Sequence, residues 1–142
     1  MGYGVKFKDN RIAVNAKMSS LIESILLEVA AELQSQTARN TKVDTGQTKN
    51  SWAYKVHSVE VGESVATIGS PLMNAIYEEF GTGEYALNGN GRKGGWFYKD
   101  EKGKGHFTHG KKPRRPFWNA YTTLKPRLIR HMQNKFQGGM TK

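Results

Sequence analysis

The chain has 142 residues, no cysteine, and a net charge of +10 from 22 Lys and Arg against 12 Asp and Glu. This length predicts one domain with a modest core, and the lack of cysteine excludes disulfides, thiol catalysis and thiolate zinc sites. No apolar stretch approaches the roughly 18 residues of a membrane span, and the N-terminal residues lack the apolar centre of a signal peptide, so we expect synthesis in a cytoplasm. The charge favours a polyanion or an acidic protein surface as partner, although a lysine-rich face is also ordinary solvated surface.

The first 40 residues predict an extended arm followed by a long helix. Residues 3–15 alternate loosely about a central Asp-Asn, which predicts a short hairpin or arm. Ser20 and Glu23 fit the capping box that begins a helix. Apolar residues then recur at three- and four-residue spacing as far as Leu33, so this helix should fade over residues 36–39.

The middle of the chain predicts a hairpin and a short helix. After the polar connection 40–46, the hydrophobic period changes to two from Ser51, which indicates a strand. Residues 59–69 predict a hairpin with a turn at Gly-Glu. Ser70 can then cap a helix that has proline at its first position and ends at Gly81.

Residues 81–116 differ from everything before them, since they hold nine glycines, nine Lys or Arg and only three acids. We expect a flexible, basic, glycine-rich hairpin over 84–115, because such a segment buries little surface by itself. A second helix should run from Pro116 to about Phe136, with a kink at Pro126.

Together these elements predict one α+β domain over residues 1–137, followed by a disordered tail at 138–142. The long N-terminal helix and the C-terminal helix should pack on one face of a small antiparallel β-sheet. The basic hairpin should project from this body.

The triplet Asp44-Thr45-Gly46 has the local pattern of an aspartic protease. Such a protease needs two carboxylates that share one proton, so a chain of this length would have to dimerise. The residues before the triplet are polar and charged, whereas the catalytic Asp of these enzymes follows a buried apolar strand. We therefore interpret the triplet as a turn in which Asp44 caps the backbone and Gly46 takes a positive φ.

No other motif predicts catalysis, a metal site or a bound cofactor. The glycine-rich residues 89–95 lack the strand, helix and spacing of a phosphate-binding loop. His106 and His109 are three apart, so they should face opposite sides of a strand. The acids are too scattered for a metal-dependent nuclease, and no Ser-His-Asp set can be assigned. We predict that the chain is not an enzyme.

The basic cluster 111–115 stands beside Phe107, Phe117 and Trp118. Cations interleaved with aromatic rings suit single-stranded nucleic acid, and they equally suit an acidic protein surface. The sequence leaves these two alternatives open. The candidate contact residues are Arg92, Lys93, Lys111, Lys112, Arg114 and Arg115.

Three stretches, taken in order, resemble one known family. "VDTGQTKNS" (43–51) is similar to the V-D-T-G-x-[LT]-[RK]-x-S segment of the tail-completion proteins of long-tailed double-stranded DNA phages, which are also described as head–tail joining or minor structural proteins. "NAIYEEFGTG" (74–83) resembles their Y-A-x-Y-V-E-F-G-T segment, and "RRPFWNAY" (114–121) resembles Q-P-F-[LM]-x-P-A. The resemblance covers about residues 18–136.

The chain departs from the family pattern at three positions. Asn74 replaces the usual Tyr, Glu78 replaces an apolar residue, and Asn119 stands where Pro is common. Each motif alone has low specificity, so the resemblance depends on the order and spacing of the three.

The resemblance implies a structural role in the phage neck. Family members form a ring, expected to be sixfold, between the head-closure protein of the connector and the tail terminator or tail-tube protein. The ring joins a finished tail to a DNA-filled head, and DNA passes through its channel. The expected location is therefore the virion, after synthesis in the host cytoplasm and without a membrane. The alternative from the residues alone is a small basic nucleic-acid-binding module.

The resemblance also assigns provisional roles to the motif residues. The first motif is a turn between the long helix and the sheet, the second ends the short helix, and the third closes the basic hairpin and anchors the last helix in the core. The turn residues are Asp44, Thr45 and Gly46; the helix-end residues are Tyr77, Phe80, Gly81 and Thr82; the closure and anchor residues are Pro116, Phe117 and Trp118.

Overall fold

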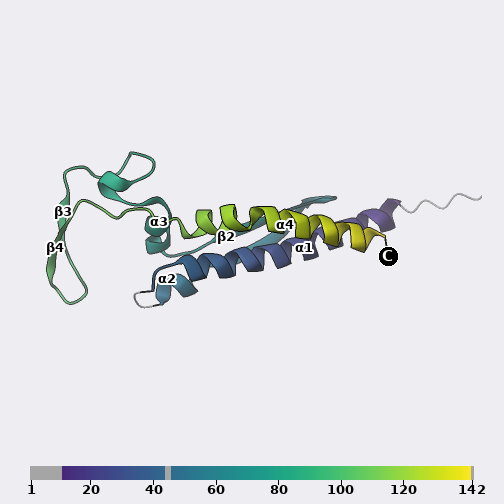
Figure 1. The fold of residues 1–142 in the computed structure, drawn as a ribbon, viewed down its shortest axis with the longest axis horizontal. Coiled ribbons are helices and arrows are strands. Elements are labelled where there is room, and N and C mark those ends of the chain that lie inside the picture. Colours follow the sequence, from purple (N-terminus) through teal and green to yellow (C-terminus); the bar gives the residue numbers. More distant parts are fainter. Residues whose placement is uncertain (1–10, 44–45, 142) are drawn as a thin grey trace, which may run out of the picture.

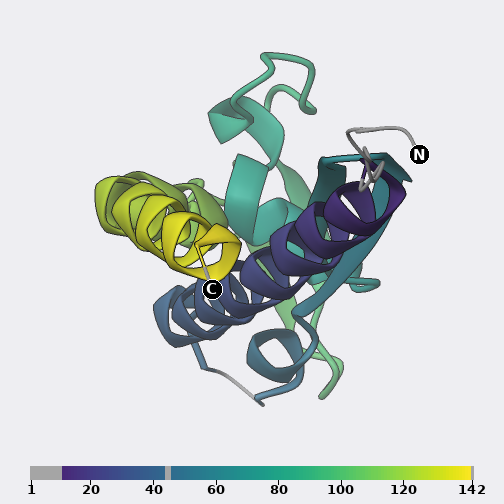
Figure 2. The same cartoon turned by 90° about the vertical axis from the view of Figure 1, so that its right-hand side faces the viewer.

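The computed structural model describes residues 11–43 and 46–141, which form an elongated α+β structure (Figure 1). The two long helices, α1 (Arg11–Asn40) and α4 (Pro116–Met140), lie side by side and run in opposite directions. Figure 2 shows the same pair along the length of the molecule, with the strands of the glycine-rich segment beyond them. The predicted α+β class with a long N-terminal and a C-terminal helix is confirmed.

The first sheet packs on α1. β1 (Ala53–Glu60) and β2 (Glu63–Gly69) pair antiparallel and are joined by a tight turn at Val61 and Gly62, one residue earlier than predicted. Gly62 has a φ of 77°, which suits glycine in a turn of this kind.

The hydrophobic core lies where α1, α4 and β2 meet. Val29 and Leu33 of α1 are buried against Leu128 of α4. Ala30 and Ala120 are fully buried, so small side chains let the helices approach closely. The partly buried residues packed on this core are Ile68, Tyr121, Leu124 and Met132.

The predicted start of the first helix at Ser20 is wrong, because α1 already begins at Arg11. Residues 11–15 are therefore helical rather than extended, and the rest of the predicted arm lies outside the described residues. The additional turns of helix contact the β1–β2 turn. The hydroxyl of Ser19 accepts a hydrogen bond from the backbone N–H of Gly62 at 3.1 Å, so the capping-box pattern lies in the middle of the helix.

The predicted strand start at Ser51 is also wrong, because the short helix α2 (Gln47–Asn50) comes first. The Ser51 backbone N–H and hydroxyl both donate to the Thr48 carbonyl, which closes this turn. Trp52, the residue before β1, is buried, and its indole N–H donates to the hydroxyl of Thr41 at 2.8 Å.

The short helix α3 (Met73–Phe80) ends at Gly81 as predicted, but it begins later than Pro71. The Ser70 hydroxyl accepts from the backbone N–H of Leu72, ahead of the helix. α3 buries its acidic side chains and exposes its apolar ones, the reverse of an ordinary amphipathic helix. Its buried residues are Ala75, Glu78 and Glu79, whereas Met73, Ile76, Tyr77 and Phe80 are exposed.

The glycine-rich segment contains a second, separate sheet, where one sheet was expected. The 3₁₀ helix η1 (Gly83–Tyr85) is followed by β3 (Trp96–Lys99), which pairs antiparallel with β4 (Gly105–Thr108). Strand pairing thus covers only the outer part of segment 84–115.

The last helix, α4, continues through Pro126 and past Phe136 to Met140. Its last turn is closed by the backbone N–H of Thr141, which donates to the carbonyl of Gln137 at 3.2 Å. The helix therefore extends into the segment for which a disordered tail was predicted.

Candidate functional site

Within residues 11–43 and 46–141, no group of three or more His, Asp or Glu side chains could hold a metal ion. In the same residues, no helix is long and apolar enough to span a bilayer. Asp44 and Thr45 lie outside the described residues, so their predicted capping role stays a prediction. Gly46 has the predicted positive φ, at 82°.

The histidines of the glycine-rich segment have different carboxylate partners. His106 Nε2 lies 2.8 Å from Asp100 Oδ2, and His109 Nδ1 lies 3.4 Å from Glu84 Oε2. The two rings therefore do not form one site. The Asp100 partner of His106, which the sequence did not indicate, belongs to the turn between β3 and β4.

The base of the glycine-rich segment is closed by hydrogen bonds between residues 78–84 and 109–115, which we call the basal clamp. The backbone N–H of Thr82 donates to the Lys111 carbonyl at 2.9 Å, and the Lys111 N–H donates to the Thr82 hydroxyl at 2.7 Å. Glu84 and His109 are joined by a further backbone bond of 2.9 Å. The second and third sequence motifs thus meet in space.

Glu79 fixes the start of α4 within this clamp. Its two carboxylate oxygens accept the backbone N–H groups of Phe117 at 2.9 Å and Trp118 at 3.1 Å. These are N–H groups of the first turn, which have no partner inside the helix. A carboxylate at this end also interacts favourably with the helix dipole. Glu79 therefore caps a helix that begins 37 residues later in the chain.

Glu78 holds the basic side of the clamp. Its carboxylate, with 3% of the side chain exposed, contacts the ammonium of Lys111 and lies 4.0 Å from Arg114 Nε. Its carbonyl accepts the backbone N–H groups of Arg114 at 2.8 Å and Arg115 at 3.1 Å. A buried carboxylate needs such cationic partners, since an isolated buried charge is strongly unfavourable.

Gly81 permits the close approach within the clamp. Its φ of 74° and ψ of 173° lie in a region that only glycine adopts readily. A Cβ at this position would lie 2.8 Å from Pro113 Cδ and 2.9 Å from the carbonyl oxygens of Lys111 and Tyr85. This is the physical reason for glycine in the EEFGTG motif.

Of the six basic candidate contact residues, three point to the buried carboxylates: Lys111 and Arg114 to Glu78, and Arg115 to Glu79 at 3.9 Å. The others are Arg92, which lies over the Trp96 ring, Lys112, which lies over the Tyr85 ring, and the exposed Lys93. The structure thus gives internal partners to residues chosen as external contacts. Their role in assembly stays a prediction.

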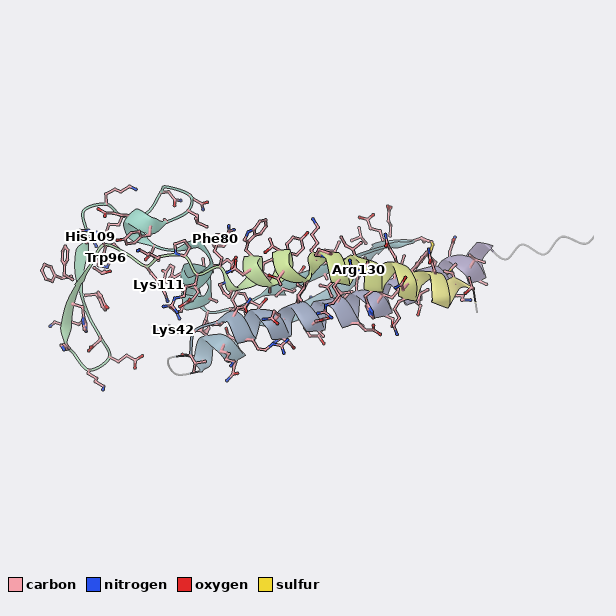
Figure 3. The ribbon with its side chains drawn as sticks, viewed as in Figure 1. Lys42, Phe80, Trp96, His109, Lys111 and Arg130 are labelled. Carbon is pink, nitrogen blue, oxygen red and sulfur yellow. The ribbon has the colours of Figure 1, made fainter. Side chains whose placement is uncertain are left out.

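The two predicted aromatic anchors, Phe117 and Trp118, differ in how far they are buried. Trp118 is 44% exposed and Phe80 is 43% exposed, while Phe117 is partly buried. Ile76 and Tyr77 of α3 are also exposed. Ile76, Phe80 and Phe117 line an open hollow of about 230 Å³, with Trp52 among its other lining residues. Figure 3 shows Phe80, the last residue of α3, at the end of the helical body from which the glycine-rich segment projects.

Sequence reasoning missed the buried Glu78–Glu79 pair. The available signal was an adjacent pair of acids inside a short amphipathic helix, together with a run of cations shortly before the next helix. The pairing of these acids with the cations follows from one substitution. Glu78 stands where the family usually has an apolar residue, and a buried carboxylate there needs a cationic partner.

Comparison with known proteins identifies one family. Residues 6–81, which are 76 of the 142, match the family described as "Bacteriophage HK97-gp10, putative tail-component". The match covers α1, the first sheet and α3, and it ends at Gly81, so the third motif lies beyond it. No curated protein and no solved structure matches the chain. Because the match spans more than half of the chain, this protein belongs to the HK97-gp10-like family of bacteriophage tail components.

Proposed function

We propose that this chain is a tail-completion subunit that joins the tail to the DNA-filled head. Its copies form a ring at the phage neck, sixfold as in the family that the motifs resemble. The observation that carries the proposal is the projection formed by β3 and β4. Phe97 is 81% exposed and Phe107 is 51% exposed, and the two rings contact each other edge to face at 4.8 Å. An apolar pair presented in this way on a basic projection is typical of a binding surface.

The basal clamp supports this role because it fixes where the projection leaves the body. The clamp joins both ends of the projection to α3 and α4 through Glu78 and Glu79. A contact surface on such a base loses less conformational entropy on binding than one on a free loop. We propose that the clamp residues are ordered in the free chain. Only the outer part of the projection then becomes ordered, when it binds a neighbouring subunit.

The proposed partners are other copies of the chain, the head-closure protein of the connector, and the tail terminator or tail-tube protein. DNA passes through the channel of the ring. The exposed Lys99, Lys102 and Lys104 near the tip of the projection suit acidic protein surfaces above or below it.

The test is head–tail joining in vitro. Extracts of a phage that lacks this protein should contain filled heads and separate tails, and the purified chain should restore infectious particles. A variant in which residues 97–107 are replaced by Asn-Gly keeps the clamp and connects Trp96 to Thr108, which are paired in the structure. It should fold and fail to join. Joining at the wild-type level would contradict the proposal.

One observation favours a second candidate, a nucleic-acid-binding module. Exposed aromatic rings beside Lys99, Lys102 and Lys104 are the side chains that bind single-stranded nucleic acid. This function predicts binding of DNA by the isolated protein, with an affinity that falls steeply as salt rises. It also predicts no effect of the protein on joining in the extracts.

A further inference from the structure

A groove with cationic and aromatic walls lies between the β3–β4 projection and α3. It has an open volume of about 780 Å³, and no carboxylate is among its lining residues. We call it the basic groove. Figure 3 shows two of its residues, Trp96 on the projection and Lys111 beside α3. The lining residues are Asn74, Tyr77, Thr82, Gly83, Arg92, Trp96, Tyr98, Thr108, Gly110 and Lys111.

Arg92 is the cation of this groove that is free to meet a ligand. Its guanidinium lies 5.4 Å from the centre of the Trp96 ring, and the side chain is exposed. In the described part of the chain, Arg92 forms no ion pair, whereas Lys111 already contacts Glu78. Lys93 adds a second exposed cation next to it. The groove therefore suits a ligand that carries carboxylates beside apolar side chains.

A surface of that composition lies on the turn between β1 and β2. Val59 is 55% exposed and Val61 is 63% exposed, and they alternate with the exposed Glu60 and Glu63. We call residues 59–63 the acidic turn. Neither carboxylate forms an ion pair with any described residue.

The two carboxylates of the acidic turn stand opposite each other, since Glu60 and Glu63 are cross-strand partners. Like charges in this arrangement destabilise a hairpin, and a cation placed between them would relieve the repulsion. This is the feature that points to a cationic partner for the turn.

The acidic turn and the basic groove lie at opposite ends of the molecule. Gly62 contacts Ser19 near the start of α1, and the groove lies beyond α3 at the other end (Figure 1). One chain cannot bring them together. Two copies can, and the pair then still has one unused turn and one unused groove. Contacts of this head-to-tail type produce rings or filaments.

We infer that the acidic turn of one copy docks into the basic groove of the next. Glu60 and Glu63 meet Arg92 and Lys93, while the exposed valines pack on the rings of Trp96 and Tyr98. The inference rests on the proposed ring and names the contact between its subunits. Charge complementarity between two surfaces of the same chain favours a second copy as the occupant.

The test uses two variants that each lose one surface, Glu60→Lys with Glu63→Lys, and Arg92→Glu with Lys93→Glu. Sedimentation velocity should show concentration-dependent assemblies for the wild type and only monomer for each variant. In an equal mixture of the two variants, the acidic turn of one meets the basic groove of the other, and the Lys-substituted turn meets the Glu-substituted groove. The mixture should therefore assemble like the wild type. All four changes in one chain should restore assembly, because the charges are exchanged.

Two control variants carry charge reversals of the same sign elsewhere. Lys55→Glu with Arg130→Glu reverses two exposed cations on β1 and α4, outside the groove and the projection, and Glu101→Lys reverses one exposed acid in the turn between β3 and β4. Both should assemble like the wild type. Circular dichroism should show that every variant is folded.

The inference and the proposed function fail in different ways. If the turn and groove variants assemble like the wild type, the contact is wrong and the ring stands. If the wild type remains monomeric up to its solubility limit, both the contact and self-assembly are wrong. If the groove variant is defective only with added heads or tails, the occupant is another virion protein, and the inference is overturned.

Discussion

Glu79 and Phe117 are joined across the fold by a hydrogen bond of 2.9 Å from the Phe117 backbone N–H to a carboxylate oxygen of Glu79. This bond joins the last turn of α3 to the first turn of α4. The relative position of the exposed side chains of Phe80 and Trp118 therefore depends on one buried carboxylate.

Replacing Glu79 should therefore destabilise the whole chain. Glu79→Ala leaves two N–H groups of the α4 first turn without their acceptor and Arg115 without its carboxylate, and we expect a loss of about 2–3 kcal/mol in the free energy of unfolding. Glu79→Gln retains one acceptor and should lose less. Urea denaturation measures both, with the exposed Glu101→Gln as control. Equal stability of Glu79→Ala and wild type would contradict the capping role.

Gly81→Ala should destabilise the chain through both backbone strain and crowding. The backbone region of Gly81 costs other residues about 1–3 kcal/mol, and the new Cβ would also press on Pro113 and the Lys111 carbonyl. Gly89→Ala is the matched control, because Gly89 also has a positive φ, of 70°, but open space around it. Thermal unfolding should show a larger loss for Gly81→Ala. The same loss in both variants would mean that crowding has no part in the clamp.

The turn between β3 and β4 should be sensitive to acid. The hydrogen bond with His106 lowers the pKa of the Asp100 carboxyl below its ordinary value, and the backbone N–H groups of Lys104 and Lys102 lower it further. Because the folded pKa is depressed, the turn should be stable above the ordinary pKa of about 3.9 and should loosen as pH falls through the lower folded value.

The amide resonances of Lys102 and Lys104 in a pH titration by NMR report this change directly. Their transition should have a midpoint below the ordinary aspartate value in the wild type and should be absent in Asp100→Asn. A midpoint at or above that ordinary value would show that His106 does not hold the carboxylate in solution.

Pro126→Ala should stabilise α4. Proline in the interior of a helix lacks the N–H that would bond to the preceding turn, and its exposed ring makes no contribution to the core described above. The unfolded chain has more conformational freedom with alanine than with proline, which offsets part of this effect. We therefore expect the free energy of unfolding to rise by about 1–2 kcal/mol. Urea denaturation provides the measurement, and Thr123→Ala is a control on the same exposed side of the chain. A loss of stability would indicate that α4 needs the proline to follow α1.

Phe97→Ser should separate stability from assembly. Since Phe97 is 81% exposed, its replacement should change the free energy of unfolding by less than about 0.5 kcal/mol. Head–tail joining should nevertheless fall, because the edge-to-face pair with Phe107 is lost. Tyr54→Ser, on the exposed part of β1, is the control for joining. Unchanged joining in Phe97→Ser would remove the projection from the assembly surface.

The sequence predicts local structure well where a strong period acts over many residues. The spacing of Leu33 and its neighbours located α1, and the turn chemistry at Gly62 and Gly81 was found in the structure. The sequence predicts local structure poorly where contacts between residues far apart in the chain determine it. The turns of α1 before Ser20 contact the β1–β2 turn through Ser19 and Gly62, and no local pattern indicates that contact.

The orientation of α3 is the clearest case of a distant partner. Apolar residues of a short helix, such as Ile76, Tyr77 and Phe80 here, ordinarily face the core. Instead, Glu78 and Glu79 are buried, because Lys111, Arg114 and the N-terminus of α4 neutralise or satisfy them. The apolar side chains of Ile76, Tyr77 and Phe80 are thereby left exposed.

The basal clamp also makes the glycine-rich segment a replaceable insert. Thr82 and Lys111 are held together by two hydrogen bonds, so the distance across the base does not depend on the chain between them. Each doubling in the length of such an insert costs only about 0.6 kcal/mol in loop closure. Foreign peptides or small domains can therefore replace residues 97–107, between the paired Trp96 and Thr108, and the body formed by α1, α4 and the first sheet should keep its fold.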